Sequence, residues 1–196
     1  ILNALSGEDG FPKIQSYQAG SENEILVMSL LGDNLSMLKE QCGDRFSLKT
    51  IVMLALQIIP RIESLHGKGV LHRDIKPENF VMGNNAGDAG KVFMIDFGLS
   101  VPYLDNKRRH VPFSQDKKIG GTLYYLSAFG HLGIKASRRD DLISLGYMLI
   151  HLSKGELPWA KLPGNRQEKM IRMFQMKSNL NLEILCQGLP EEFCEY

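Results

Sequence analysis

The segment Leu71–Phe80, which reads LHRDIKPENF, places carboxylates, cations and an amide on ten consecutive positions between two apolar runs. Within it, Asp74 follows a histidine and an arginine and precedes Asn79 by five residues. A second acidic residue, Asp96, lies 22 residues after Asp74 at the start of the tripeptide D-F-G, directly behind the apolar run KVFMI. Either tripeptide alone would most simply be a solvated turn. Together, in this order and spacing, they predict a site of chemistry.

Phosphoryl transfer is the reaction that needs this set of side chains. It requires a carboxylate that orients and deprotonates a hydroxyl, cations that spread the phosphate charge, and hard oxygen ligands for magnesium. We predict that Asp74 is the base and that Lys76 contacts the transferred phosphoryl group, while Asn79 and Asp96 supply the metal oxygens. Eight motif residues occur in order. At roughly one chance in twenty per position, coincidence is negligible.

The composition is that of an ordinary globular chain and argues against several classes of protein. Apolar residues make up 43% and charged residues 23% of the 196 positions. The net charge of +1 argues against a general nucleic-acid binder. The apolar run 51–60 ends at Pro60, well short of a membrane span. Three cysteines without a close pair favour a reducing compartment and no structural zinc. We therefore expect a cytoplasmic location, with the nucleus as an alternative, and neither a nucleic-acid nor a membrane partner.

The hydrophobic pattern predicts an α+β fold, with strands early in the chain and mainly helices after them. Residues 1–5 indicate the end of a helix, and the apolar stretches 12–19 and 24–31 indicate a hairpin that turns at 20–23. Ser47 is placed to cap a long helix with apolar residues on one face. Further predicted segments are helices at 33–43, 141–154 and 165–177 and short strands at 69–72, 79–83 and 91–97.

Four longer stretches carry a resemblance that covers essentially the whole chain. They are LHRDIKPENFVMG (71–83), IDFGLS (95–100), HLGIKASRRDDLISLGYML (131–149) and GELPW (155–159). The chain resembles a eukaryotic protein kinase, and its surroundings are similar to the casein kinase 1 family. The tau-tubulin kinases share parts of the pattern, but the stretch from HLGI to SRRDDL fits casein kinase 1 better. The resemblance implies a protein-kinase-like fold, ATP and Mg²⁺ as cofactors, and a monomer that acts on Ser or Thr hydroxyls of protein substrates.

The resemblance also implies an adenine site. The segment VMSLLG would be the hinge, with Met28 as gatekeeper and the main chains of Ser29 and Leu31 bonding the adenine. Val81 would form the apolar floor under the adenine. Lys76 would be the phosphate-contacting lysine typical of Ser/Thr kinases. In the alternative interpretation, Met28 and Val81 are ordinary core residues.

Residues beside Asp74 have structural interpretations as well. Asp141 would brace the loop around Asp74 from a buried helix, by the same resemblance. His72 is more simply a structural histidine packed under the loop than a proton carrier, and Arg73 can pair with a nearby carboxylate.

Parts of the kinase pattern have no counterpart in the chain. No G-x-G-x-x-G loop precedes the hinge, and no strand lysine with its helix glutamate can be placed. We therefore expect a truncated kinase fold, in which 1–31 is a remnant of the small lobe and hinge and 32–196 is a large lobe that is incomplete at its end. We expect these residues alone to be inactive. At Tyr124 the chain also departs from relatives that carry an anion-binding arginine.

Two functions of different classes remain open. The first is an ATP-dependent serine/threonine protein kinase of the casein kinase 1 type. The second is a catalytically inactive kinase remnant that binds other proteins. The base, the metal ligands and Lys76 favour the first, whereas the missing glycine loop and strand lysine favour the second.

Overall fold

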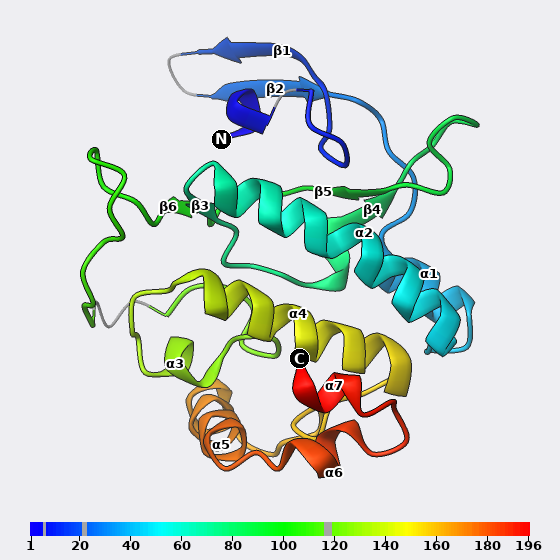
Figure 1. The fold of residues 1–196 in the computed structure, drawn as a ribbon, viewed down its shortest axis with the longest axis vertical. Helices are drawn as coiled ribbons and strands as arrows, with labels where there is room; N and C mark the ends of the chain where they lie inside the picture. Colours follow the sequence, from blue (N-terminus) through cyan, green and yellow to red (C-terminus); the bar gives the residue numbers. More distant parts are fainter. Residues whose placement is uncertain (6, 21–22, 116–118) are drawn as a thin grey trace.

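Strands gather at one end of the molecule and helices fill the rest (Figure 1). The computed structural model describes residues 1–5, 7–20, 23–115 and 119–196. The helices are α1 (Leu35–Gln41), α2 (Leu48–Gly67), α3 (Ala128–His131), α4 (Arg138–Lys154), α5 (Arg166–Ser178), α6 (Leu182–Cys186) and α7 (Glu192–Glu195), with 3₁₀ helices at η1 (Leu2–Leu5) and η2 (Pro77–Asn79). The strands are β1 (Ile14–Ala19), β2 (Glu24–Met28), β3 (Val70–Leu71), β4 (Phe80–Met82), β5 (Val92–Met94) and β6 (Val101–Pro102).

The predicted hairpin is present as the antiparallel pair β1–β2, in which Ile14 lies opposite Met28. The Gly20 N–H donates to the Asn23 carbonyl at 2.9 Å, and residues 21–22 of the predicted turn lie outside the described residues. The expected helix end at 1–5 is a 3₁₀ helix instead, since its bond joins the Ala4 N–H to the carbonyl three residues earlier.

Capping side chains decide where the two long helices begin. Ser47 caps α2 as predicted, because its hydroxyl accepts the Thr50 N–H at 3.2 Å, and the helix then continues through Pro60. Helix α4 begins at Arg138, three residues earlier than expected. The cause is a capping box, in which the Asp140 carboxylate accepts the Ser137 N–H at 2.8 Å.

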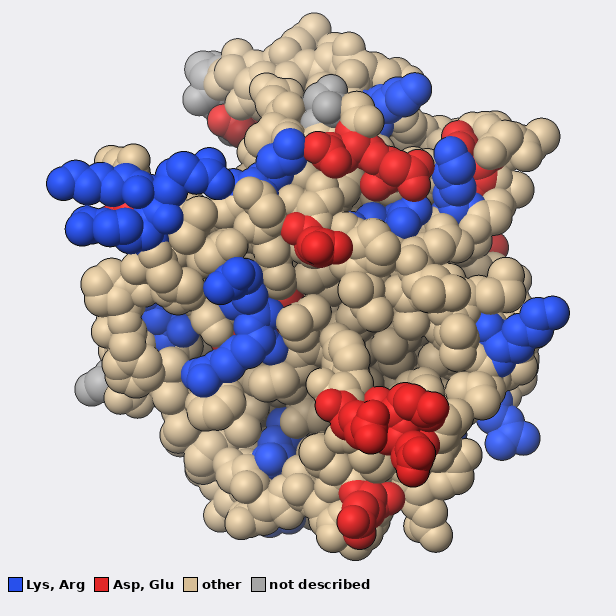
Figure 2. Space-filling model, in the orientation of Figure 1, with Lys and Arg blue, Asp and Glu red and all other residues tan. Residues whose placement is uncertain are grey.

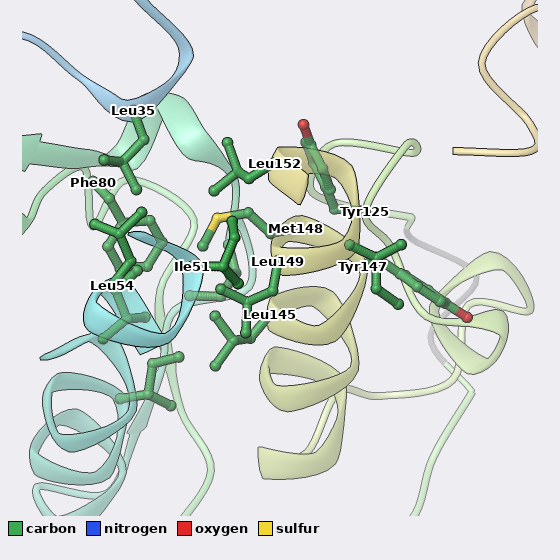
Figure 3. Close-up of a cluster of buried hydrophobic side chains, with 14 of the residues drawn as sticks. Leu35, Ile51, Leu54, Phe80, Tyr125, Leu145, Tyr147, Met148, Leu149 and Leu152 are labelled. Atoms are coloured by element: carbon green, nitrogen blue, oxygen red, sulfur yellow. The ribbon is translucent and has the colours of Figure 1, made fainter. Parts of the chain in front are cut away.

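The core lies between α2 and α4, whose apolar faces point toward each other (Figure 3). Burying one such aliphatic side chain is worth about 1.5–3 kcal/mol. On another side of α4, Tyr147 packs edge-on against the fully buried Trp159, with ring centroids 5.0 Å apart. The facing side chains in Figure 3 are Ile51 and Leu54 from α2 and Leu145, Met148, Leu149 and Leu152 from α4, with Leu35 and Phe80 beside them.

Two small sheets flank the loop that contains Asp74 and the segment that contains Asp96. Strands β4 and β5 lie in two of the predicted strand segments and pair antiparallel, with Val81 opposite Phe93. Strand β3, also in a predicted segment, pairs with β6. Strand β6 was not predicted, because two residues show no periodicity. The short helices α3, α6 and α7 were not predicted for the same reason.

A buried arginine of α2 holds the chain before β1. Arg61 is 6% exposed and donates to the Val92 carbonyl at 2.7 Å, the Gln57 carbonyl at 2.6 Å and the Asp9 carboxylate at 3.1 Å. Gly10 lies against it at φ +81°, and a Cβ there would be 2.0 Å from Arg61 Nε. The position therefore excludes any side chain while Arg61 is in place.

Charge is distributed unevenly over the surface. Figure 2 shows lysine and arginine side chains on the side where the loop after β6 and the start of α4 lie, and acidic side chains over α6 and α7. Among the described residues, the helices are all too short or too polar to cross a membrane.

Candidate active site

Asp141 of α4 hydrogen-bonds the main chain of the loop between β3 and β4. The Asp141 carboxylate is 2% exposed and accepts the His72 N–H at 2.9 Å and the Arg73 N–H at 2.8 Å. It also accepts a bond from His66 Nε2 at 2.8 Å. Arg73 has φ +68°, a conformation that costs a residue with a side chain about 1–3 kcal/mol. The bracing contact expected for Asp141 is therefore present, and it supports a strained turn.

Asp74 is surrounded by donors. Its Oδ1 accepts the Thr122 N–H at 2.9 Å and the Thr122 hydroxyl at 2.8 Å, and its Oδ2 lies 2.6 Å from Lys76 Nζ. Burial of Asp74 opposes ionisation, but the bonds from Lys76 and Thr122 outweigh it and hold the pKa of Asp74 below its ordinary value. The carboxylate is thus ionised and oriented at neutral pH.

Asn79 and Asp96 are brought together by the β4–β5 pair. The Asn79 carbonyl accepts the Ile95 N–H at 3.0 Å, which places Asn79 beside the residue that precedes Asp96. Asn79 Nδ2 donates to the Asp74 carbonyl at 2.8 Å, so its Oδ1 is the atom left for a cation. Asp96 Oδ1 accepts the Gly98 N–H at 3.1 Å, which leaves its Oδ2.

This pair of oxygens fits Mg²⁺ better than a metal that needs a full protein cage. The described residues contain no group of three or more His, Cys, Asp and Glu side chains that could hold an ion. Magnesium commonly uses one or two carboxylates together with substrate phosphates and water. Asn79 and Asp96 could supply such a partial ligand set.

His72 is a structural residue in this arrangement. It is fully buried, its Nε2 lies 3.0 Å from the Ile95 carbonyl, and its Nδ1 accepts the Asp74 N–H at 3.3 Å. Burial lowers the pKa of His72. Its ring packs on Phe97 of the D-F-G tripeptide, with centroids 5.4 Å apart. A neutral ring donating from Nε2 and accepting at Nδ1 satisfies both contacts.

The four residues predicted for the adenine site line one cavity of about 450 Å³. Met28, Ser29 and Leu31 border it from β2 and the hinge, and Val81 from β4. The Ser29 N–H is used by the Lys13 carbonyl at 2.9 Å. In the described part of the chain, nothing bonds the Ser29 carbonyl or the Leu31 N–H, so these are the hinge groups open to a ligand.

A second cavity, of about 310 Å³, lies beside the first, between β2 and the D-F-G tripeptide. It shares Leu26 and Met28 with the first cavity and is also lined by Asp96 and Phe97. The adenine residues and Asp96 therefore border neighbouring spaces, as a nucleotide that reaches from hinge to metal would require.

Tyr124 is turned inward. Its hydroxyl accepts the Leu157 N–H at 2.8 Å, and its ring packs edge-on against Tyr125 and His151 at 5.0 and 5.3 Å. Tyr124 is therefore a half-buried residue that packs against the core.

Sequence reasoning missed three residues of this site. Thr122, which holds Asp74, lies 48 positions away, and its signal would have been the glycine pair before it at 120–121. Leu26 and Ile95 line the first cavity from the strand before the hinge and from the position before Asp96. The alternation of Leu26 with Met28 along β2 could have indicated Leu26, whereas Ile95 has no such signal.

A comparison with protein-family models finds one match that spans most of the chain. The model is that of the protein kinase domain, and it matches residues 13–190. The match includes the hinge, the loop around Asp74 and the D-F-G tripeptide.

Proposed function

The chain belongs to the protein kinase domain family, and we propose that it is a serine/threonine kinase of the casein kinase 1 type. In this proposal the γ-phosphoryl group of ATP is transferred to Ser or Thr hydroxyls of protein substrates. We propose that it acts as a monomer.

The observation that carries the proposal is the environment of Asp74. Thr122 fixes one carboxylate oxygen, and the other faces Lys76 at 2.6 Å. A substrate hydroxyl bonded to Asp74 would lie beside the Lys76 ammonium, which can neutralise charge on the phosphoryl group. Because the pKa of Asp74 is lowered, its main task would be to orient the hydroxyl and accept its proton as the phosphoryl group arrives.

The nucleotide would extend from the hinge to Asp96. The Ser29 carbonyl and the Leu31 N–H would bond the adenine above Val81, with Met28 at the back of the cavity. Asn79 and Asp96 would hold Mg²⁺, which when bound neutralises charge on the phosphates.

One observation favours the alternative, a catalytically inactive module that binds proteins. Strands β1 and β2 read IQSYQA and EILVM, so neither carries a lysine that could clamp the ATP phosphates. Catalysis by positioning needs that clamp. We therefore expect residues 1–196 by themselves to transfer no measurable phosphate.

The test separates the two functions by supplying the clamp. Residues 1–196 are joined in frame behind the glycine loop and lysine strand of a casein kinase 1, and labelled ATP is offered with casein as acceptor. The matched blank is the Asp74→Asn version, which keeps the shape of the side chain but removes the base. We expect transfer about 10²–10⁴-fold above this blank. Equal rates in the two proteins would reject the kinase proposal in favour of the binding module.

A further inference from the structure

Lys177 of α5 is a buried cation outside the groups named so far. The residue is 5% exposed, and its ammonium donates to three main-chain carbonyls of one segment. The distances are 2.8 Å to Leu123, 3.1 Å to Tyr124 and 2.7 Å to Leu126. Lys177 therefore bonds the carbonyls of Leu123, Tyr124 and Leu126 with a single side chain.

No carboxylate in the described ranges pairs with Lys177; its other neighbours are rings. The ammonium lies 4.8 Å from the Trp159 ring centroid and 5.2 Å from that of Tyr147, and it is 3.3 Å from His131 Nε2. Burial lowers the pKa of Lys177 to about 7. A buried ammonium is costly unless it is well bonded, so the three carbonyls are what keeps it in this place.

The segment that Lys177 holds leads directly into the site. The N–H groups of Tyr125 and Leu126 donate to the Thr122 carbonyl at 3.0 and 3.1 Å. Thr122 in turn donates twice to Asp74 Oδ1. Trp159 supports the same segment, since its Nε1 donates to the Tyr124 carbonyl at 2.8 Å.

We propose that Lys177 is a positioning residue of the phosphotransfer site, which fixes the main chain of residues 123–126 so that Thr122 holds Asp74. The role of Lys177 in catalysis rests on the proposed function, whereas its contacts with residues 123–126 are independent of that function. Figure 1 shows that α5 lies against α3 at the far side of α4 from α2, and the hydrogen-bonded path from the ammonium to Asp74 runs through residues 122–126.

The experiment uses residues 1–196 and needs no catalytic turnover. It measures both the segment that Lys177 bonds and the contact between Thr122 and Asp74. Lys177→Met removes the donors, and amide hydrogen exchange at Thr122, followed by NMR, reports whether its N–H still bonds Asp74 Oδ1. Amide exchange at Tyr125 and Leu126 reports on the segment itself. We expect the amides of Thr122, Tyr125 and Leu126 to exchange about 10- to 100-fold faster as their hydrogen bonds weaken.

Lys154→Met is the matched control. Lys154 is exposed, and its ammonium also donates to a main-chain carbonyl, that of Leu185 at 2.8 Å, away from the segment. This variant should leave both measurements at the wild-type values. A role in stability alone would lower the unfolding temperature without a larger change in exchange at these three amides than at other core amides.

A folded Lys177→Met protein with unchanged exchange at Thr122, Tyr125 and Leu126 would overturn the proposal. If that variant does not fold, Lys177→Arg is measured instead, because it keeps the charge but cannot place its planar donors on the same three carbonyls. A smaller increase in exchange at these amides supports the proposal, and no increase overturns it. Lack of kinase activity would reject the proposed function while leaving these two measurements unaffected.

Discussion

Replacing Asp141 by asparagine should loosen the loop around Asp74 while changing almost nothing in side-chain volume. The carboxylate accepts three bonds, two at Oδ2 from His66 and His72 and one at Oδ1 from Arg73. An amide has one accepting oxygen and one donating nitrogen. If the oxygen keeps the two bonds at the Oδ2 position, the nitrogen faces the Arg73 N–H, donor against donor.

The expected magnitude follows from this geometry. A hydrogen bond to a charged group is worth about 1.5–3 kcal/mol, and the two remaining bonds become weaker neutral ones. The Arg73 conformation at φ +68° loses the contact that holds it. Leaving the part-buried Arg73 N–H without an acceptor costs about 1–3 kcal/mol. We therefore expect Asp141→Asn to lower the free energy of unfolding by at least an amount in that range, because the two remaining bonds also weaken.

Urea unfolding followed by circular dichroism measures the loss, and amide exchange at Arg73 locates it. Asp140→Asn is the control, because Asp140 is also buried in the first turn of α4 but accepts bonds from Ser127 and Ser137. Loss of such a cap costs about 1 kcal/mol and should leave the Arg73 amide unchanged. The reasoning fails if Asp141→Asn is no more destabilising than Asp140→Asn, or if exchange at Arg73 stays the same.

Three further predictions concern the nucleotide, the acceptor and pH. Asp96→Ala should weaken Mg²⁺-dependent ATP binding, because a metal carboxylate is lost; equal affinities in a calorimetric titration of the clamp-extended protein would contradict this. Because Tyr124 is turned inward and neutral, a peptide with a phosphoserine upstream of the acceptor should have little advantage over the plain peptide in kcat/KM, and a large advantage would refute the reasoning. Burial, with nearby lysines, lowers the pKa of His131 and of His151 from 6.5 to about 4. Between pH 6.5 and pH 4 the unfolded state therefore binds more protons than the folded state, and the protein loses stability as the pH falls through this range. Unfolding temperatures from pH 7.5 to 4.5 should therefore fall less steeply in a His131→Gln/His151→Gln protein, whereas the exposed His110→Gln should keep the wild-type slope.

The predictable part of the site is the part whose residues are close in sequence. Asp74, Lys76 and Asn79 share one loop, and Asp96 follows the strand that pairs with the end of that loop, so a motif contains their arrangement. The long helices could also be predicted from the sequence, because the twenty residues of α2 and the seventeen of α4 show a clear apolar period or run.

The remaining part depends on contacts across the fold. Thr122 reaches Asp74 over 48 positions and Lys177 reaches Leu126 over 51, and neither distance leaves a periodic signal. Lys177 in particular sits in a basic, Met-rich stretch whose composition suggests a solvated helix. Bonds to the main chain of residues 123–126 and packing against Trp159 turn that lysine inward. The catalytic and adenine-binding roles remain predictions, although the structure brings their residues together.

The contact between Gly10 and Arg61 restricts the order in which these two positions can change. Any replacement of Gly10 would place its Cβ 2.0 Å from Arg61 Nε, and the glycine also holds a φ of +81°. A shortened residue at 61 would remove that clash, but it would also release the bonds to Asp9 and Val92. The two substitutions should therefore be strongly non-additive, with position 10 open to variation only in chains that have already lost the guanidinium. Among diverging relatives, a side chain at position 10 should be a marker that the chain before β1 is anchored to α2 by some other means.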